Sequence, residues 1–415
     1  MIEGLLPARV LSVRMRPALG ARAGARVPPA DSSLRNLTVK ILLIPDSFKG
    51  SLSSARLCAV MKAAALDVMP DAQVTSIPAA DGGEGTLDVI RNSLGGSFVV
   101  HTVTGPCGQP VSARYLSVGD TAYVEMAEAA GMQHRLPGFS AGNTTTYGVG
   151  QLIGAAIDAG HRRIVVSLGG SCTTDAGCGM AAALGVRFTA PNGRHFIPTG
   201  ATLGAIRHIA LNPFFVQSGI RIEALCDVTN PLCGPKGCSR VFGPQKGATP
   251  EMVEMMEAGM QHLAAIFEHG KGPKLADMPC AGAAGGCAAG IRAFLNGKLH
   301  SGSDALLDLM KFSDLAADAD LIVTGEGRVD DQTAGGKLVS AVASRANGTP
   351  VVVLAGAVAE GTKLEALYAK GVTAVVPVTS RPMTLGEAMS SSADEVRFAA
   401  TQLFRLLKTM KAMKA

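Results

Sequence analysis

The two ends of the chain share one pattern, in which a short apolar run is followed by residues at helical spacing. Residues 39–44 form such a run, and residues 51–69 carry apolar side chains at helical intervals. Residues 73–77 then alternate, and a second helix is expected to open at Glu84 or Thr86. A strand without polar alternation is typical of a sheet buried on both faces. The β-α-β-α order therefore predicts parallel strands.

The middle of the chain follows another pattern. Three strands are predicted at residues 96–104, 111–118 and 123–126, and the short turns between them favour antiparallel pairing. Further elements are expected as a helix at 147–159, strands at 163–168 and 220–226, and a helix at 250–268.

From residue 304 helices and strands alternate again. The expected elements are helices at 304–317, 336–346, 360–370 and 384–410, and strands at 321–324, 351–356 and 374–378. The simplest architecture is α/β: a parallel-sheet domain formed by residues 38–85 and 288–415, interrupted by a mixed α/β domain at residues 86–287.

Composition narrows the function classes. The 415 residues are 47% apolar and 17% charged, which suits a globular protein of more than one domain. The first forty residues hold seven of the 38 basic and two of the 33 acidic residues, so the rest of the chain carries 31 of each. A neutral body without Trp predicts no nucleic-acid partner. No apolar run is long enough to span a bilayer, so no membrane partner is expected.

Compartment and assembly are predicted from the cysteines and the leader. The nine cysteines contain no C-x-x-C, which favours free thiols in a reducing, intracellular setting. Residues 1–37 are arginine-rich and acid-poor, as in a mitochondrial transit peptide, although a disordered tail explains them equally well. We expect a cytoplasmic protein, or a mitochondrial one if the leader is a transit peptide. A homo-oligomer is compatible with the sequence.

The common nucleotide motifs are absent. The sequence has no G-x-x-x-x-G-K-[ST] and no complete G-x-G-x-x-G. The first candidate site is DSFKGS, which offers Asp46, Ser47 and Lys49 where a strand ends. The second is DGGEG, whose Asp81 and Glu84 could bind Mg²⁺ or transfer a proton. Either cluster alone is as well explained by a capped turn.

The strongest phosphate site is SLGGSCTTDAG. Gly169 and Gly170 let backbone amides approach an anion, while Ser171 and Thr174 add hydroxyl donors. A tight packing turn is the alternative explanation. Three further clusters carry polar residues. Asp227 and Asn230 lie at another strand end, and Gln245 and Lys246 lie on a glycine-flanked loop before a helix. The third cluster follows a buried strand and contains Thr324, Gly325, Glu326 and Lys337.

The clusters together are stronger evidence for a ligand site than any one of them alone. Open parallel sheets bind ligands outside the carboxyl ends of their strands, and Asp46, Asp81 and Glu326 all follow predicted strands. Carboxylates for Mg²⁺, donors for phosphate and an acid or base for a hydroxyl are the set that phosphoryl transfer needs.

The motifs resemble those of the bacterial (type 1) glycerate kinases. The sequence contains, in the family's order, PDSFKGSL, ADGGEGT, TTTYG, LGGSCTTDAGCGM, CDVTNPLCGPKG, VFGPQKGATP, CAGAAGG where the family has GAGAAGG, and VTGEGRVDDQT. The resemblance covers about residues 39–407. It implies a kinase that transfers phosphate from ATP, with Mg²⁺, to D-glycerate, giving 2-phosphoglycerate. It also implies a flavodoxin-like domain built from both chain ends and a central domain with a restriction-enzyme-like fold.

The resemblance assigns roles to the candidate residues. For this chain we expect small-molecule substrates, D-glycerate and ATP, bound in an interdomain cleft. We group the residues as catalytic (Asp46, Lys49, Asp81, Asp175), substrate-binding (Ser47, Asp227, Asn230, Lys246), phosphate- or nucleotide-binding (Gly169, Gly170, Ser171, Thr174, Thr324, Gly325, Lys337) and metal-binding (Glu84, Glu326). Either Asp46 or Asp81 would accept the proton of the substrate hydroxyl.

Two positions depart from the family. Thr174 stands where Asn is common, and Gly335 where His is frequent. Because both fall in candidate ligand loops, two alternatives stay open. One is a non-catalytic sensor that binds glycerate or nucleotide. The other is a kinase that gives 3-phosphoglycerate or acts on another small hydroxy acid.

Overall fold

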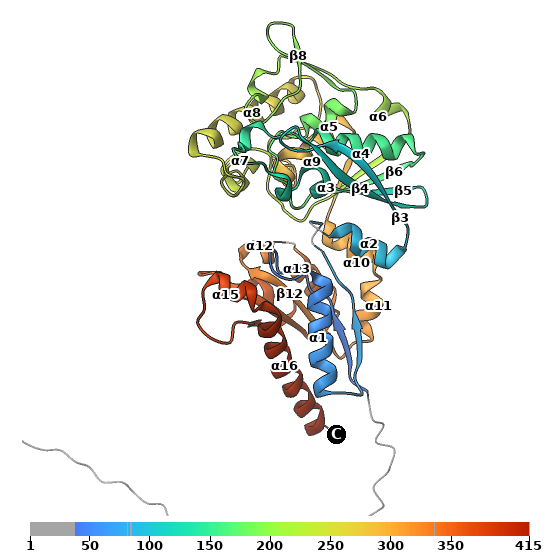
Figure 1. Ribbon diagram of the computed structural model, residues 1–415, viewed down its shortest axis with the longest axis vertical. Coiled ribbons are helices and arrows are strands. Elements are labelled where there is room, and N and C mark those ends of the chain that lie inside the picture. Colours follow the sequence, from blue (N-terminus) through green and yellow to red (C-terminus); the bar gives the residue numbers. More distant parts are fainter. Residues whose placement is uncertain (1–37, 81, 84, 336, 415) are drawn as a thin grey trace, which may run out of the picture. The chain divides into compact units, whose positions relative to one another are not determined.

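The computed structural model describes residues 38–80, 82–83, 85–335 and 337–414 (Figure 1). Residues 38–414 belong to one compact unit. The leader at residues 1–37 and two predicted site residues, Asp81 and Glu84, lie outside the described residues.

Both chain ends build one parallel sheet. Its strands are β1 (Lys40–Leu43), β2 (Gln73–Ser76), β12 (Leu321–Val329), β13 (Val351–Val358) and β14 (Val372–Pro377). They lie in the order β14-β13-β12-β1-β2, and every pair is parallel. Numbered within this sheet, the order is 2-1-3-4-5, the flavodoxin-like arrangement with its switch point between the first and third strands. The α/β fold predicted for the two ends is confirmed.

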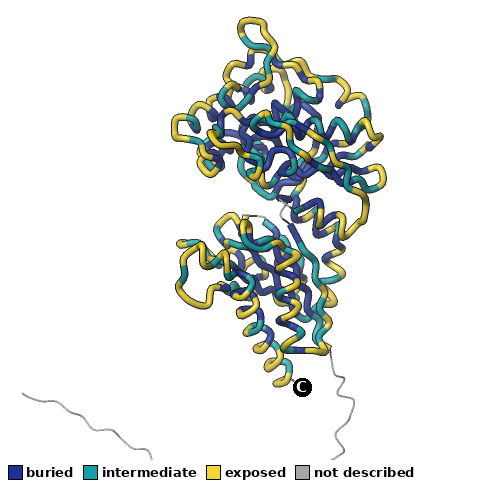
Figure 2. Tube along the Cα trace, viewed as in Figure 1, coloured by how far each residue is buried: buried dark blue, intermediate teal, exposed yellow. Residues whose placement is uncertain are grey.

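Alternate residues of β1 face opposite sides of this sheet. Ile41 and Leu43 belong to a core with helices α1 (Ser54–Val68) and α16 (Ser392–Lys414). Leu42 and Ile44 belong to a core with α2 (Thr86–Leu94), α10 (Gly302–Leu309), α11 (Phe312–Ala317) and α13 (Leu338–Arg345). Burial on both faces explains the apolar run that predicted this strand, and the centre of the sheet is correspondingly dark in Figure 2.

A mixed sheet forms from the middle of the chain. Its order is β11-β10-β6-β5-β4-β3. Its strands are β3 (Ser97–Thr104), β4 (Pro110–Val118), β5 (Thr121–Glu125), β6 (Arg163–Ser167), β10 (Arg221–Leu225) and β11 (Lys298–His300). The β3–β4 and β4–β5 pairs are antiparallel, as predicted, and the others are parallel. Because β11 pairs with β10, this sheet extends past the domain boundary expected at residue 287.

Helices and a small sheet complete the middle region. The helices are α3 (Met126–Ala130), α4 (Tyr147–Asp158), α5 (Cys178–Ala183), α6 (Phe214–Gln217), α7 (Cys238–Phe242), α8 (Pro250–His269) and α9 (Ala283–Phe294). Strands β7 (Arg187–Thr189), β8 (His195–Phe196) and β9 (His208–Ala210) form a three-stranded sheet. The restriction-enzyme-like assignment of this region stays a prediction.

Several predicted bounds are wrong. The helix expected at 304–317 is two helices, separated where Lys311 adopts a φ of 53°. The last helix is likewise divided into α15 (Leu385–Ser390) and α16, and the helix at 360–370 shrinks to α14 (Glu365–Tyr368). Strand β12 continues to Val329 because its backbone keeps pairing with β13. Periodicity alone does not reveal such breaks and extensions.

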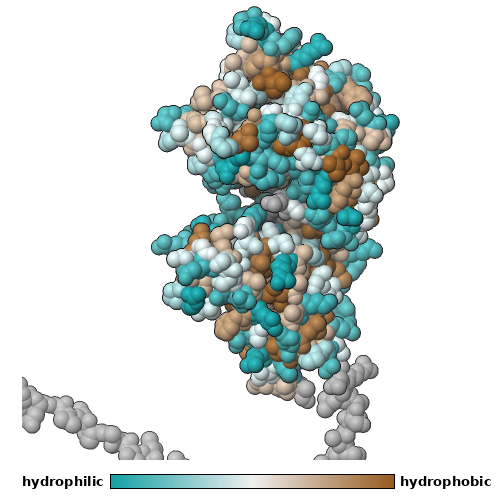
Figure 3. Space-filling view, in the orientation of Figure 1, coloured by the Kyte–Doolittle hydropathy of each residue, from teal (hydrophilic) through white to brown (hydrophobic). Residues whose placement is uncertain are grey.

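Two further findings bear on the predicted setting. All nine cysteines are free. Within the described part of the chain, no helix has both the length and the apolar character needed to cross a bilayer. On the face drawn in Figure 3, apolar residues are scattered among polar ones.

We expect Phe404→Ala to lower the free energy of unfolding by about 3–5 kcal/mol, because the ring is fully buried between α16 and the sheet. Urea denaturation measures this loss. Leu406→Ala in the same helix is the control, since this side chain is 59% exposed, and its effect should stay within about 0.5 kcal/mol. Equal losses for both variants would contradict the packing described for α16.

Candidate active site

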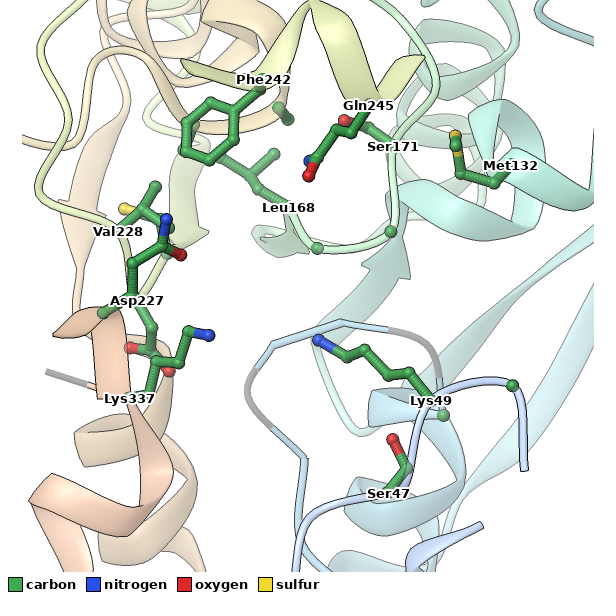
Figure 4. A pocket seen from close by; sticks show the side chains of 18 of the residues that line it. Ser47, Lys49, Met132, Leu168, Ser171, Asp227, Val228, Phe242, Gln245 and Lys337 are labelled. Carbon is green, nitrogen blue, oxygen red and sulfur yellow. The ribbon is translucent and has the colours of Figure 1, made fainter. Parts of the chain in front are cut away.

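A pocket of about 740 Å³ takes its walls from loops that follow strands of both large sheets (Figure 4). Its volume is in the range of small-molecule sites. The lining segments are residues 47–54, 168–171, 225–228 and 241–242, together with Gly85, Met132, Gln133, Gln245, Lys246, Ala283, Ala284, Gln332 and Lys337.

The loop after β1 supplies one wall. The backbone N of Asp46 donates to the carbonyl of Gly325 at 2.8 Å, which prolongs the β1–β12 pairing beyond the end of β1. Asp46 is 6% exposed, and its Oδ1 accepts from the backbone N of Ser47 at 2.7 Å. Ser47 and the exposed Lys49 line the pocket, and Figure 4 shows the Lys49 ammonium extended into it. The predicted DSFKGS site thus lines the pocket from Ser47 to Ser51, while Asp46 is buried just outside the lining.

The loop after β6 supplies the opposite wall. Gly169, Gly170 and Ser171, for which a phosphate cradle was predicted, line the pocket. The backbone N of Gly169 donates to Gly82 O at 2.9 Å, and a Cβ at Gly169 would lie 2.2 Å from the Cα of Gly83. Only glycine permits this approach. The glycine therefore brings the cradle against the segment in which DGGEG was predicted.

Lys246 lies buried beneath the cradle at 3% exposure and forms part of the pocket wall. Its Nζ donates to Ser171 Oγ at 3.0 Å and to Thr173 O at 2.6 Å. Burial lowers the pKa of Lys246 from 10.5 to about 8, and the nearby Cys238, Cys172 and Asp175 oppose that shift. An ammonium group with two of its three protons bound can direct the third toward an anion. Its predicted part in substrate binding fits this position.

Asp175 does not line the pocket, although a catalytic role was predicted for it. The side chain is fully buried, and its two oxygens accept from Thr146 N, Thr146 Oγ1, Gly177 N and Gly179 N at 2.7–3.1 Å. Burial raises the pKa of Asp175, while these hydrogen bonds act against that rise. The carboxylate joins the start of α4 to the start of α5, so we assign it a positioning role instead.

Thr174 is also buried outside the pocket, at 1% exposure. Its hydroxyl has no hydrogen-bond partner within the described residues. The predicted phosphate contact of Thr174 is therefore not supported by its position. The deep burial of Thr174 goes with the turn that follows it, in which Ala176 and Gly177 adopt φ values of 54° and 70°.

The loop after β10 brings Asp227 to the pocket but not Asn230. The Asp227 carboxylate accepts from Ser303 N at 2.9 and 3.0 Å and from Ser301 Oγ at 3.3 Å, so it holds the start of α10. Asn230 donates from Nδ2 to Lys236 O at 2.8 Å, which serves the local turn. Lys337 precedes α13 and extends into the same pocket (Figure 4).

Thr324 and Gly325 belong to β12 and do not line the pocket, contrary to the predicted nucleotide loop. Thr324 is fully buried and donates from Oγ1 to Ile44 O at 2.8 Å. A Cβ at Gly325 would lie 2.3 Å from Leu354 O, so this glycine allows close strand packing. Glu326 follows them, 8% exposed, on the strand beside Asp46. Two carboxylates therefore stand at the switch point.

A protein-only metal cage is not present in the described part of the chain, where no three His, Cys, Asp or Glu side chains could hold an ion. Mg²⁺ does not need such a cage, because it is commonly held by one or two carboxylates, waters and substrate phosphates. Asp46 and Glu326, which lie outside the pocket lining, carry oxygens of this kind and would hold the ion. The described residues therefore fit an Mg²⁺ that arrives with a nucleotide.

Sequence reasoning missed several pocket residues that carry no charge. Met132, Phe242 and Ala284 contribute to the walls. The run AGAAGG held a signal for one of them: Ala284, Gly285 and Gly286 all have φ between 55° and 86°. A Cβ at Gly285 would lie 2.1 Å from Thr173 O, so this glycine run packs tightly behind the cradle.

Comparison with known proteins places this site in a family. The Glycerate kinase family matches residues 41–408. The glycerate kinase of Bacillus subtilis (strain 168) is 37% identical over 382 residues, covering 90% of this chain and 99% of that protein. The glycerate 2-kinase of Escherichia coli (strain K12) is 36% identical, with coverage of 86% and 95%. A crystal structure of glycerate kinase 2 from Salmonella typhimurium LT2 superposes with a TM-score of 0.73 at 37% identity, covering 90% of this chain and all of that one.

The pKa of Lys246 predicts a pH-dependent stability. Unfolded lysine titrates near 10.5 and folded Lys246 near 8, so the unfolded chain binds more protons between these values and stability rises with pH across this window. Below pH 8 the full cost of burying the ammonium is present. Relative to Lys246→Met, the unmodified protein should therefore gain about 2 kcal/mol between pH 7.5 and 10. Urea titrations of both proteins at each pH measure it, and a constant difference would contradict the shift.

Proposed function

We propose that this chain, which belongs to the glycerate kinase family, uses ATP and Mg²⁺ to phosphorylate D-glycerate at its 2-hydroxyl. Family membership makes the chain a phosphotransferase. The single observation that carries the finer proposal is the pocket itself, in which lysines from three segments surround a glycine turn; two buried carboxylates, Asp46 and Glu326, lie at the switch point outside its lining.

The lysines suit two anionic groups. Lys246 is buried under Ser171 and is held there by two hydrogen bonds, so its charge acts at a defined point of the cradle. Lys49 and Lys337 reach the pocket from separate loops and lie nearer to solvent. A phosphate beside Gly169 and Gly170 would meet Lys246, while the carboxylate of glycerate or the transferred phosphoryl group would meet Lys49.

The proton of the substrate hydroxyl needs an acceptor close to the transferred group. Asp46 is the described carboxylate at the base of the Lys49 loop, and Glu326 adjoins it on β12. We assign the proton to Asp46 and an Mg²⁺ ligand to Glu326, with Asp81 and Glu84 of the neighbouring segment as the predicted second acceptor and second ligand. When bound, Mg²⁺ would neutralise charge on the phosphates.

Of the two family departures, the position of Thr174 favours catalysis over a sensor. Thr174 lies buried away from the pocket, and Gly335 ends helix α12 (Asp331–Ala334) outside its lining. The Thr174 change therefore leaves the wall of this pocket as it is, whereas Gly335 lines a smaller adjoining cavity. We therefore rank three alternatives below this proposal: a sensor without turnover, a kinase that gives 3-phosphoglycerate, and a kinase that acts on another small hydroxy acid.

The product test is direct. Full-length protein is incubated with ATP, Mg²⁺ and D-glycerate, and phosphorus NMR distinguishes the two phosphoglycerates. We expect 2-phosphoglycerate. A 3-phosphoglycerate signal would keep the kinase and overturn the position of transfer. Folded protein that binds glycerate but releases no product would favour the sensor.

Replacing Lys49 by Ala should lower kcat/KM for glycerate at least ~100-fold, because the variant loses a cation that faces the transferred charge. Steady-state assays with saturating ATP measure it. Lys62→Ala in the exposed face of α1 is the matched control, outside the pocket, and should keep normal kinetics. Near-normal kinetics in the Lys49 variant would remove that residue from the site.

A further inference from the structure

A second cavity, of about 310 Å³, adjoins the first and shares Cys226, Asp227 and Val228 with it. Its lining also contains Cys280, which does not reach the first pocket. Cys226 directly follows β10 and precedes the pocket residue Asp227. The wall between the two cavities therefore carries a pair of cysteines.

The two thiols interact. Cys226 and Cys280 line the same cavity, each alters the pKa of the other, and neither is in a disulfide. Cys226 is 5% exposed, whereas Cys280 is half-buried and open to the second cavity. A reagent in that cavity would meet Cys280 first.

The backbone at Cys280 is unusual for a residue with a side chain. Its φ is 67°, in the left-handed region that glycine adopts without strain. This cysteine is the first residue of CAGAAGG, at the position where the resembling family has glycine. The chain thus carries a thiol where a side chain is disfavoured and where a partner thiol is in reach.

Their chemistry differs from that of most of the other cysteines. The interaction with Cys226 lowers the pKa of Cys280, while the same interaction and burial raise the pKa of Cys226. By contrast, burial raises the pKa of a further six thiols, those of Cys58, Cys172, Cys178, Cys233, Cys238 and Cys287. Because the thiolate is the nucleophile, oxidation should select Cys280.

We propose that Cys226 and Cys280 form a reversible disulfide that controls the first pocket. With a small-molecule disulfide such as oxidised glutathione, the Cys280 thiolate attacks one sulfur and releases one glutathione thiolate. Cys226 then attacks the Cys280 sulfur of the mixed disulfide, and its proton goes to the second departing thiolate. Two protein thiols are oxidised and one disulfide is reduced to two thiols.

The bond would act on the pocket through both of its loops. A disulfide holds its sulfurs about 2.05 Å apart, closer than two thiols that are not bonded to each other can approach. The 226–231 and 280–284 segments already touch, since Gly282 N donates to Asn230 O at 3.0 Å. Drawing Cys226 toward Cys280 would move the adjacent Asp227, which is held from the other side by Ser303. Small displacements of this kind cost large factors in turnover.

The experiment measures the formation of the disulfide and its effect on turnover separately. Full-length protein is oxidised with glutathione disulfide and mapped by mass spectrometry without reduction. We expect one peptide pair linked through Cys226 and Cys280, formed whether or not the proposed substrate is correct. The effect on turnover rests on the proposed function. We expect kcat/KM for glycerate to fall at least ~10-fold on oxidation and to recover with dithiothreitol.

Cys280→Gly is the test variant, because it removes the thiol and suits the left-handed backbone. Its reduced activity should be unchanged and should withstand oxidation, while Cys107→Ser, a half-buried cysteine outside both cavities, should remain as sensitive as the unmodified chain. Absence of the linked peptide overturns the site, whatever the variants do. A linked peptide with undiminished activity, or equal inhibition of Cys280→Gly, overturns the control of the pocket. Reduced protein that makes no phosphoglycerate at all refutes the proposed function instead, and leaves the peptide map to decide the disulfide.

Discussion

The candidate site depends on the pairing of β1 with β12. These strands are separated by the whole middle region, yet their backbones run side by side and continue to pair at Asp46 and Gly325, beyond the end of β1. This pairing creates the switch point at which the neighbouring crossovers leave in opposite directions. At a switch point the diverging connections leave a crevice at the carboxyl ends of the strands, and the buried carboxylates Asp46 and Glu326 lie beside it.

Glycine contacts make the second wall of the pocket. Gly169 touches the backbone of Gly82 and Gly83, and Gly285 touches that of Thr173. Each contact excludes a Cβ, so backbone from three distant segments meets within van der Waals distance. The high glycine content of the chain is thus partly a requirement of packing around the cradle.

Charge within the site is arranged by burial as well as by proximity. Lys246 is removed from water and stabilised by Ser171 and Thr173, whereas Lys49 stays exposed. Asp175, which resembles a catalytic acid in the sequence, is surrounded by four donors and braces two helices. Residues of the same type therefore serve binding or architecture according to what surrounds them.

The sequence by itself determined the parallel sheet of the two ends, the antiparallel start of the middle region and the loops that bring Lys49, Gly169 and Lys246 to a pocket. These follow from local periodicity and from residue types at strand ends. It did not determine that Gly325 continues the strand predicted to end at Thr324, that Asp175 and Asn230 stay outside the pocket, or that Cys226 meets Cys280. Those outcomes were decided only by tertiary structure, because each depends on a partner far along the chain. Gly325 packs against Leu354 of the neighbouring strand β13, and Asp175 accepts hydrogen bonds from Thr146. The partner of Cys226 is Cys280, which lies 54 positions further along.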